Sequence, residues 1–99
     1  MELKELEHKL QDAMNNHFEV TKVYIEFAER LERAKMQVID PSLRDSAEKQ
    51  VIRASKEDKS FEQLVLDTDT LRRKKDLFEK ELDFLKALLR VKELELQIK

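Results

Sequence analysis

The sequence predicts an all-α protein that folds as an antiparallel helical hairpin, with two long helices joined by a short connecting helix. Three observations lead to this prediction: the 99 residues include no glycine and only one proline, 42% are charged, and apolar residues recur at helical spacing. Average proteins contain roughly 7% glycine and 5% proline. Tight β-hairpins and phosphate-binding loops depend on glycine. Nucleotide-binding folds of the Rossmann and P-loop types are therefore excluded, and long coiled-coil-like helices are favoured.

The first long helix is expected over residues 2–39. Its apolar positions alternate by three and four residues, which is the spacing of a coiled-coil a/d seam. These seam positions are Leu3, Leu6, Leu10, Ala13, His17, Val20, Tyr24, Phe27, Leu31, Ala34 and Val38. A second apolar stripe beside the seam consists of Met14, Phe18, Ile25 and Ala28, with Thr21 between them. Two stripes widen the apolar arc, so we expect this helix to contact more than one other helix, as in a bundle.

The tripeptide Asp40-Pro41-Ser42 should end the first helix. Proline disfavours the α conformation in the residue before it and has no backbone N–H to donate. The connector, about 41–59, is expected to contain a weak helix over 43–56, with Asp40 or Ser42 as its N-cap.

A second break is expected in the polar run at 55–60. Ser60 and Gln63 match a capping box, which would start the last helix. One heptad frame nevertheless continues from Leu43 to Leu96, so a single helix over 43–99 is the alternative.

The last long helix, about 60–99, becomes more apolar from Leu77 onward. Fully burying one large apolar side chain stabilises a structure by roughly 1.5–3 kcal/mol, so this segment should associate strongly. Hairpins of this kind often pair into helical bundles. The residues expected to form the self-association or partner-binding surface are Met14, Phe18, Tyr24, Ile25, Phe27, Leu77, Phe78, Leu82, Phe84, Leu85, Leu88, Leu89 and Val91.

The charge pattern is that of a solvated helix surface. The chain has 22 acidic and 20 basic residues, and neither sign gathers in one region. The run Arg72-Arg73-Lys74-Lys75 fans out around a helix and has aspartates on both sides, so we do not expect binding to nucleic acid. The chain has no cysteine and no long apolar run, and we therefore expect a soluble cytoplasmic protein that does not enter a membrane.

Few residues in the sequence suggest a catalytic, pH-sensitive or metal-binding role. His17 lies on the first seam, where it acts either as a pH-sensitive or register-setting residue or, as we prefer, as a satisfied or half-exposed core histidine. Glu5 and His8 have the Glu-x-x-His spacing of di-iron bundles, but that site needs the motif on two helices. No nucleophile has a base beside it. We expect no enzymatic activity, no cofactor and no metal.

The sequence thus predicts a non-enzymatic protein–protein interaction module, such as a scaffold, adaptor or structural subunit. It would act through oligomerising amphipathic helices, with a homodimer favoured. The alternative is a small helical regulator or inhibitor that binds and occludes a larger enzyme or nucleic-acid-binding complex.

Overall fold

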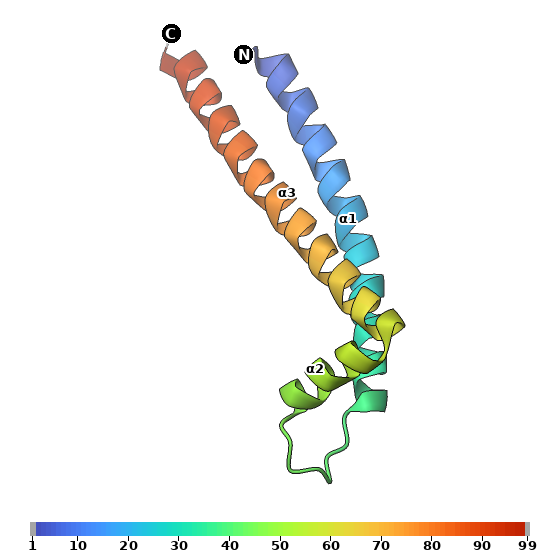
Figure 1. The fold of residues 1–99 in the computed structure, drawn as a ribbon. Coiled ribbons are helices and arrows are strands. Elements are labelled where there is room, and N and C mark those ends of the chain that lie inside the picture. Colours follow the sequence, from blue (N-terminus) through green and yellow to red (C-terminus); the bar gives the residue numbers. More distant parts are fainter. Residues whose placement is uncertain (1, 99) are drawn as a thin grey trace.

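The structure, a computed structural model, describes residues 2–98, and the end of the last predicted helix at position 99 lies outside this range. Three helices follow one another in the chain: α1 spans Leu3–Val38, α2 spans Ala47–Glu57 and α3 spans Lys59–Ile98. The two long helices run antiparallel and pack against each other, so that both ends of the described chain lie at the same end of the molecule (Figure 1). The predicted all-α hairpin is confirmed.

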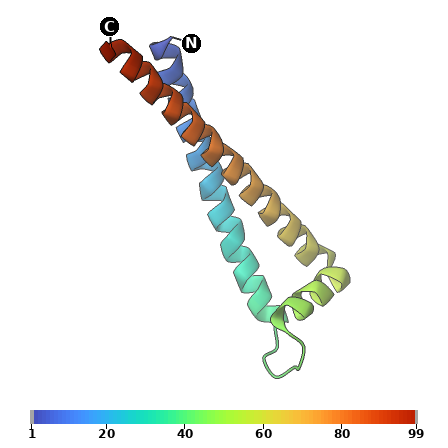
Figure 2. The same cartoon turned by 90° about the vertical axis from the view of Figure 1, so that its left-hand side faces the viewer.

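The hairpin is long and narrow, with principal dimensions of 69 × 22 × 17 Å. α2 lies at the closed end, where it contacts both α1 and α3 (Figure 2). The fold therefore consists of one long helix pair with a short helix at its base, and most of the helix surface faces outward.

The first helix ends where the proline predicts. The backbone N–H of Ile39 donates to the carbonyl of Lys35 at 2.9 Å as the last bond of α1. Asp40 and Pro41 then form a turn, in which Leu43 N donates to the Asp40 carbonyl at 3.2 Å. Aspartate before proline is a common way to begin such a turn.

The predicted start of the connecting helix is wrong. The structure begins α2 at Ala47, and the Ser46 hydroxyl caps it by accepting a hydrogen bond from Lys49 N at 3.2 Å. Asp40 cannot cap α2, because its carboxylate accepts bonds from the N–H and the hydroxyl of Ser42 at 2.9 and 2.6 Å. Residues 39–46 consequently form a loop.

The side chain of Gln50 holds this loop against α2. Its carboxamide oxygen accepts from Asp40 N at 2.6 Å, and its nitrogen donates to the carbonyls of Asp40 and Asp45 at 3.1 and 3.0 Å. Gln50 is buried, and these three bonds satisfy its polar atoms as burial requires.

The connector and the last helix are separated by a break at Asp58, so the alternative of one continuous helix over 43–99 does not hold. Asp58 has extended backbone angles (φ −122°, ψ 108°), and its carboxylate accepts bonds from Ser60 N at 3.0 Å and from Phe61 N at 3.4 Å. The predicted cap at Ser60 is wrong, because the Ser60 hydroxyl itself donates to Asp58 at 3.0 Å. Gln63 pairs with Asp67 instead.

Candidate interaction surface

The two predicted seams meet inside the hairpin. Every seam position on α1 from Leu3 to Val38 is buried or half-buried. The same holds for the seam positions of α3 in the heptad frame that starts at Leu43: Phe61, Leu64, Thr68, Leu71, Lys75, Phe78, Leu82, Leu85, Leu89 and Lys92. We call these two facing seams the "inner seams". The buried core of this contact lies toward the end of the hairpin where both ends of the described chain lie. It consists of Leu6, Ala13, Leu82 and Leu85, with Leu10, Leu88 and Leu89 packed against it. Each long helix thus uses its a/d seam to bind the other.

The predicted surface residues on α1 separate into two groups. Tyr24 and Phe27 lie on the seam and are half-buried against α3. Met14, Phe18 and Ile25 are exposed, and Phe18 leaves 66% of its surface in water. These three residues form the "α1 stripe", which nothing within the described chain covers.

The predicted surface residues on α3 separate in the same way. Leu82 and Leu85 belong to the hairpin core, and Phe78, Leu88 and Leu89 are half-buried. Leu77, Phe84 and Val91 are exposed, with exposed fractions of 65% for Leu77 and 63% for Phe84.

The exposed residues of α3 belong to a second seam with the same heptad spacing as the first. We call it the "outer seam": Leu77, Lys80, Phe84, Ala87, Val91, Leu94 and Ile98, spaced alternately by three and four and all exposed. Three apolar members, Ala87, Leu94 and Ile98, are absent from the predicted surface, although each continues the three- and four-residue spacing of the predicted members Phe84 and Val91. A helix with two such seams can bind one helix on each side.

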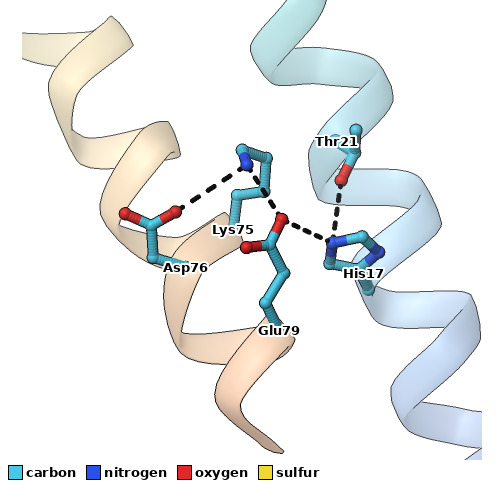
Figure 3. Close-up of polar contacts among 5 residues, drawn as sticks. All are labelled: His17, Thr21, Lys75, Asp76 and Glu79. Atoms are coloured by element: carbon cyan, nitrogen blue, oxygen red, sulfur yellow. Dashed lines mark hydrogen bonds and ion pairs between the residues drawn. The ribbon is translucent and has the colours of Figure 1, made fainter. Parts of the chain in front are cut away.

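A polar cluster joins the two long helices midway along the hairpin (Figure 3). Nε2 of His17 lies 3.2 Å from Oε1 of Glu79, and Nζ of Lys75 donates to the same oxygen at 2.9 Å. A carboxylate only accepts, so Nε2 of His17 bears the proton that it donates. The Thr21 hydroxyl lies 3.5 Å from that nitrogen, and the ammonium of Lys75 stands 5.6 Å above the ring of Tyr24.

The cluster shifts the pKa values of its charged members. The hydrogen bond from Lys75, and then the one from His17, lowers the pKa of Glu79. The same bond to Glu79 raises the pKa of Lys75. The side chain of His17 is 27% exposed and has Glu79 as a polar partner, which is the burial expected of a satisfied or half-exposed core histidine.

The basic run at 72–75 is largely paired within α3. Arg72 and Arg73 both contact the carboxylate of Asp69, at 2.6 and 3.0 Å, and Lys75 bonds to Glu79. These pairs reduce the positive charge that Arg72, Arg73 and Lys75 present to solvent.

Other predicted features lie on the surface. His8 is exposed, and Nε2 lies 4.0 Å from the carboxylate of Asp12 rather than near Glu5. Within residues 2–98, no three His, Asp or Glu side chains converge to hold a metal ion.

None of the described helices is both long enough and apolar enough to cross a membrane.

The chain matches no protein-family model, and comparisons with curated proteins and with solved structures likewise give no match. The functional argument therefore rests on the surfaces of the hairpin.

Proposed function

We propose that the protein is a non-enzymatic interaction module, such as a scaffold, adaptor or structural subunit, that binds other helices through its uncovered apolar faces. The observation that supports this proposal most directly is the exposure of Phe18, Leu77 and Phe84 in a hairpin whose a/d seams are already occupied. Soluble monomers rarely expose apolar side chains in continuous patches, and such patches are typical of interaction sites.

The thin core of the hairpin supports the same proposal. Within residues 2–98, five apolar side chains are buried: Leu6, Ala13, Phe61, Leu82 and Leu85. A long helix pair gains little burial from its own contacts because each helix covers only one side of the other. Association with further helices would bury the remaining faces and stabilise the fold.

A second copy of the chain is the occupant that we propose first, with the dimer as the favoured assembly. Helical hairpins with a second apolar face readily pair into four-helix assemblies, where each hairpin completes the core of the other. Symmetric dimers are also the commonest oligomers of soluble proteins.

The test is the mass of the chain in solution. Light scattering at tens of micromolar protein should give at least twice the mass of one chain, and a variant with both Phe18→Asp and Phe84→Asp should give the mass of a single chain. Glu19→Ala, an exposed polar change beside Phe18, is the matched control and should leave the mass unchanged. A wild-type monomer at this concentration would contradict self-association.

A second candidate function is regulation by occlusion of a larger protein complex. It is favoured by the presence of two uncovered faces on different helices, the α1 stripe and the outer seam. A dimer held by one of these faces leaves the other for a foreign partner. The single variants Phe18→Asp and Phe84→Asp should then differ in mass. The variant on the dimer face should be a monomer, and the variant on the free face should remain a dimer.

A further inference from the structure

The outer seam of α3 has the pattern of a coiled-coil interface along its whole length. Six of its seven positions are apolar, and Lys80 is the exception. The residues of the inner seam, such as Leu82 and Leu85, are buried against α1, so the outer seam faces away from the hairpin. Apolar a/d spacing sustained over about three heptads is typical of a coiled-coil interface.

The order of large and small residues makes this seam complementary to itself when two copies run antiparallel. If a twofold axis passes between Phe84 and Ala87, Phe84 lies opposite Ala87 of the second copy, and Leu77 lies opposite Leu94 of the second copy. The large Phe84 then faces a small residue, and Leu77 faces a residue of its own size. Side chains of the two helices can therefore interdigitate without voids.

The charges beside the seam agree with the same arrangement. Asp83 and Arg90 lie seven residues apart on one flank of the seam, and both are exposed. The antiparallel dimer places Asp83 beside Arg90 of the second copy, and symmetry repeats the pair. Neither residue takes part in the ion pairs found within residues 2–98, so both are available to pair with a second copy. Charge pairs beside a seam set partner choice and orientation.

A parallel pairing of the two outer seams is less favourable. In that direction Arg90 lies beside Glu95 of the second copy, but Asp76 then faces Glu81 of the second copy. The repulsion between these like charges offsets the attraction.

Lys80 does not prevent the antiparallel arrangement. It lies opposite Val91 of the second copy, toward either end of the interface. There its apolar stem can cover the valine while the ammonium reaches water.

We infer that two copies of the chain pair antiparallel through their outer seams, with Phe84 packed on Ala87 and Asp83 paired with Arg90 across a twofold axis. This inference rests on the proposed self-association and names its face and geometry. In the resulting assembly the two α3 helices lie in the centre and the two α1 helices outside. The α1 stripe remains uncovered.

A charge-reversal cycle tests the pairing. Asp83→Arg and Arg90→Asp each replace two attractive contacts by two repulsive ones, so each should weaken the dimer by about tenfold to a hundredfold. The double variant restores opposite charges and should recover the dimer. Sedimentation over a concentration series gives the dissociation constants, and circular dichroism checks that each variant remains helical.

The absence of cysteine from the chain allows a test of direction. A single Ala87→Cys places two thiols near the twofold axis, and a short thiol-to-thiol crosslinker should join two chains. In Leu77→Cys the two thiols lie near opposite ends of the interface. Each residue adds about 1.5 Å along a helix, so the thiols are too far apart for a short crosslinker to join. Efficient crosslinking of Leu77→Cys would indicate a parallel pair and overturn the inference.

The outcomes separate this inference from the proposed function. A wild-type dimer that persists in both charge reversals and in Phe84→Asp, but dissociates in Phe18→Asp, would overturn the outer-seam pairing and retain self-association. A wild-type monomer would overturn both. Dissociation by each single reversal with recovery in the double variant is the result that we expect.

Discussion

His17 on α1 and Glu79 on α3 connect the two arms of the hairpin through a 3.2 Å contact between Nε2 and Oε1. Glu79 also accepts from Lys75, so the histidine is its second partner and not its only one. His17 lies on the apolar seam of α1, whereas Glu79 lies beside the seam of α3 and is exposed. An ion pair with an exposed partner contributes little to stability. The contribution of His17 can therefore be separated from that of Lys75 by substitution.

The first prediction is that His17→Leu stabilises the hairpin. Leucine would continue the apolar seam, and its burial should raise the free energy of unfolding by about 1 kcal/mol. Urea unfolding at fixed protein concentration measures this gain. Asn16→Leu, on the neighbouring exposed position, is the control and should change stability by less than about 0.5 kcal/mol. A clear loss of stability in His17→Leu would mean that the bond to Glu79 outweighs the apolar gain.

The second prediction concerns the dependence of stability on pH. The pKa of Glu79 is lowered in the fold, chiefly by its bond from Lys75, so its contribution is complete above the ordinary value of about 4.3 and is lost as the pH falls through the folded pKa. The pKa of Lys75 is raised by the same bond, so its contribution is complete below about 10.4 and is lost as the pH rises through the folded pKa. Stability should therefore be greatest between about pH 5 and pH 10.

Lys75→Gln tests whether the bond between Lys75 and Glu79 causes these two pKa shifts, because it removes the partner that lowers the pKa of Glu79 most. The pKa of Glu79, followed by NMR, should rise toward its ordinary value, and the alkaline decline in stability should shrink. Part of the acid decline should remain, since the pKa values of Asp40 and Asp58 are also lowered, each mainly by the hydroxyl of the serine two residues later. An unchanged pKa of Glu79 would contradict the assignment.

The third prediction is that Gln50→Leu loosens the loop at 39–46. The substitution removes three hydrogen bonds, which leaves groups of Asp40 and Asp45 without their partner and should cost about 1–3 kcal/mol. Trypsin should cut faster after Arg44, which lies in this loop. Gln63→Leu removes an exposed amide of the same kind and serves as the control. Equal cleavage of the two variants would show that Gln50 does not hold the loop.

The fourth prediction concerns the corner between α2 and α3. Asp58→Ala removes the acceptor for Ser60 N and Phe61 N, so trypsin should cut faster after Lys56 and Lys59. Asp58→Asn retains a capping oxygen and should behave as the wild type at neutral pH. If the asparagine variant were cut as fast as the alanine variant, the negative charge rather than the cap would hold the corner.

The sequence predicts the inner seams well and the caps poorly. A seam position such as Ala13 or Thr68 can be identified from spacing alone, because heptad periodicity reports directly on which side of a helix faces its neighbour. The caps depend on competition within a few residues. Asp58 and Ser60 can both begin a helix, and the carboxylate of Asp58 prevails because it accepts from the backbone and from the serine hydroxyl together.

The connecting loop could not be predicted for a related reason. Gln50 lies at a seam position, and its spacing indicates only that it should be covered. In the structure the loop at 39–46 covers Gln50, which donates hydrogen bonds to the carbonyls of Asp40 and Asp45. The geometry of a folded-back loop depends on such contacts, which periodicity does not encode.

The sequence also indicates that the last helix becomes more apolar from Leu77 onward, without showing how packing against α1 divides these side chains between an inner and an outer face. The neighbours Phe84 and Leu85 are both apolar, and on a helix they point about 100° apart. Packing against α1 leaves Leu85 only 5% exposed and leaves Phe84 on the outside. Both residues belong to the predicted interaction surface, but the structure gives them different neighbours.

The last prediction uses this pair. Leu85→Asp places a carboxylate in the core beside Leu82 and should reduce the free energy of unfolding by roughly 3–5 kcal/mol, with loss of helical circular dichroism. Phe84→Asp places the same charge on the outer seam, so helicity should persist while the mass in light scattering falls to that of one chain. The two variants differ only in which of two adjacent side chains becomes charged. Equal loss of helicity in both would mean that Phe84 supports the hairpin itself, and helicity retained in both would mean that the core around Leu85 is misplaced.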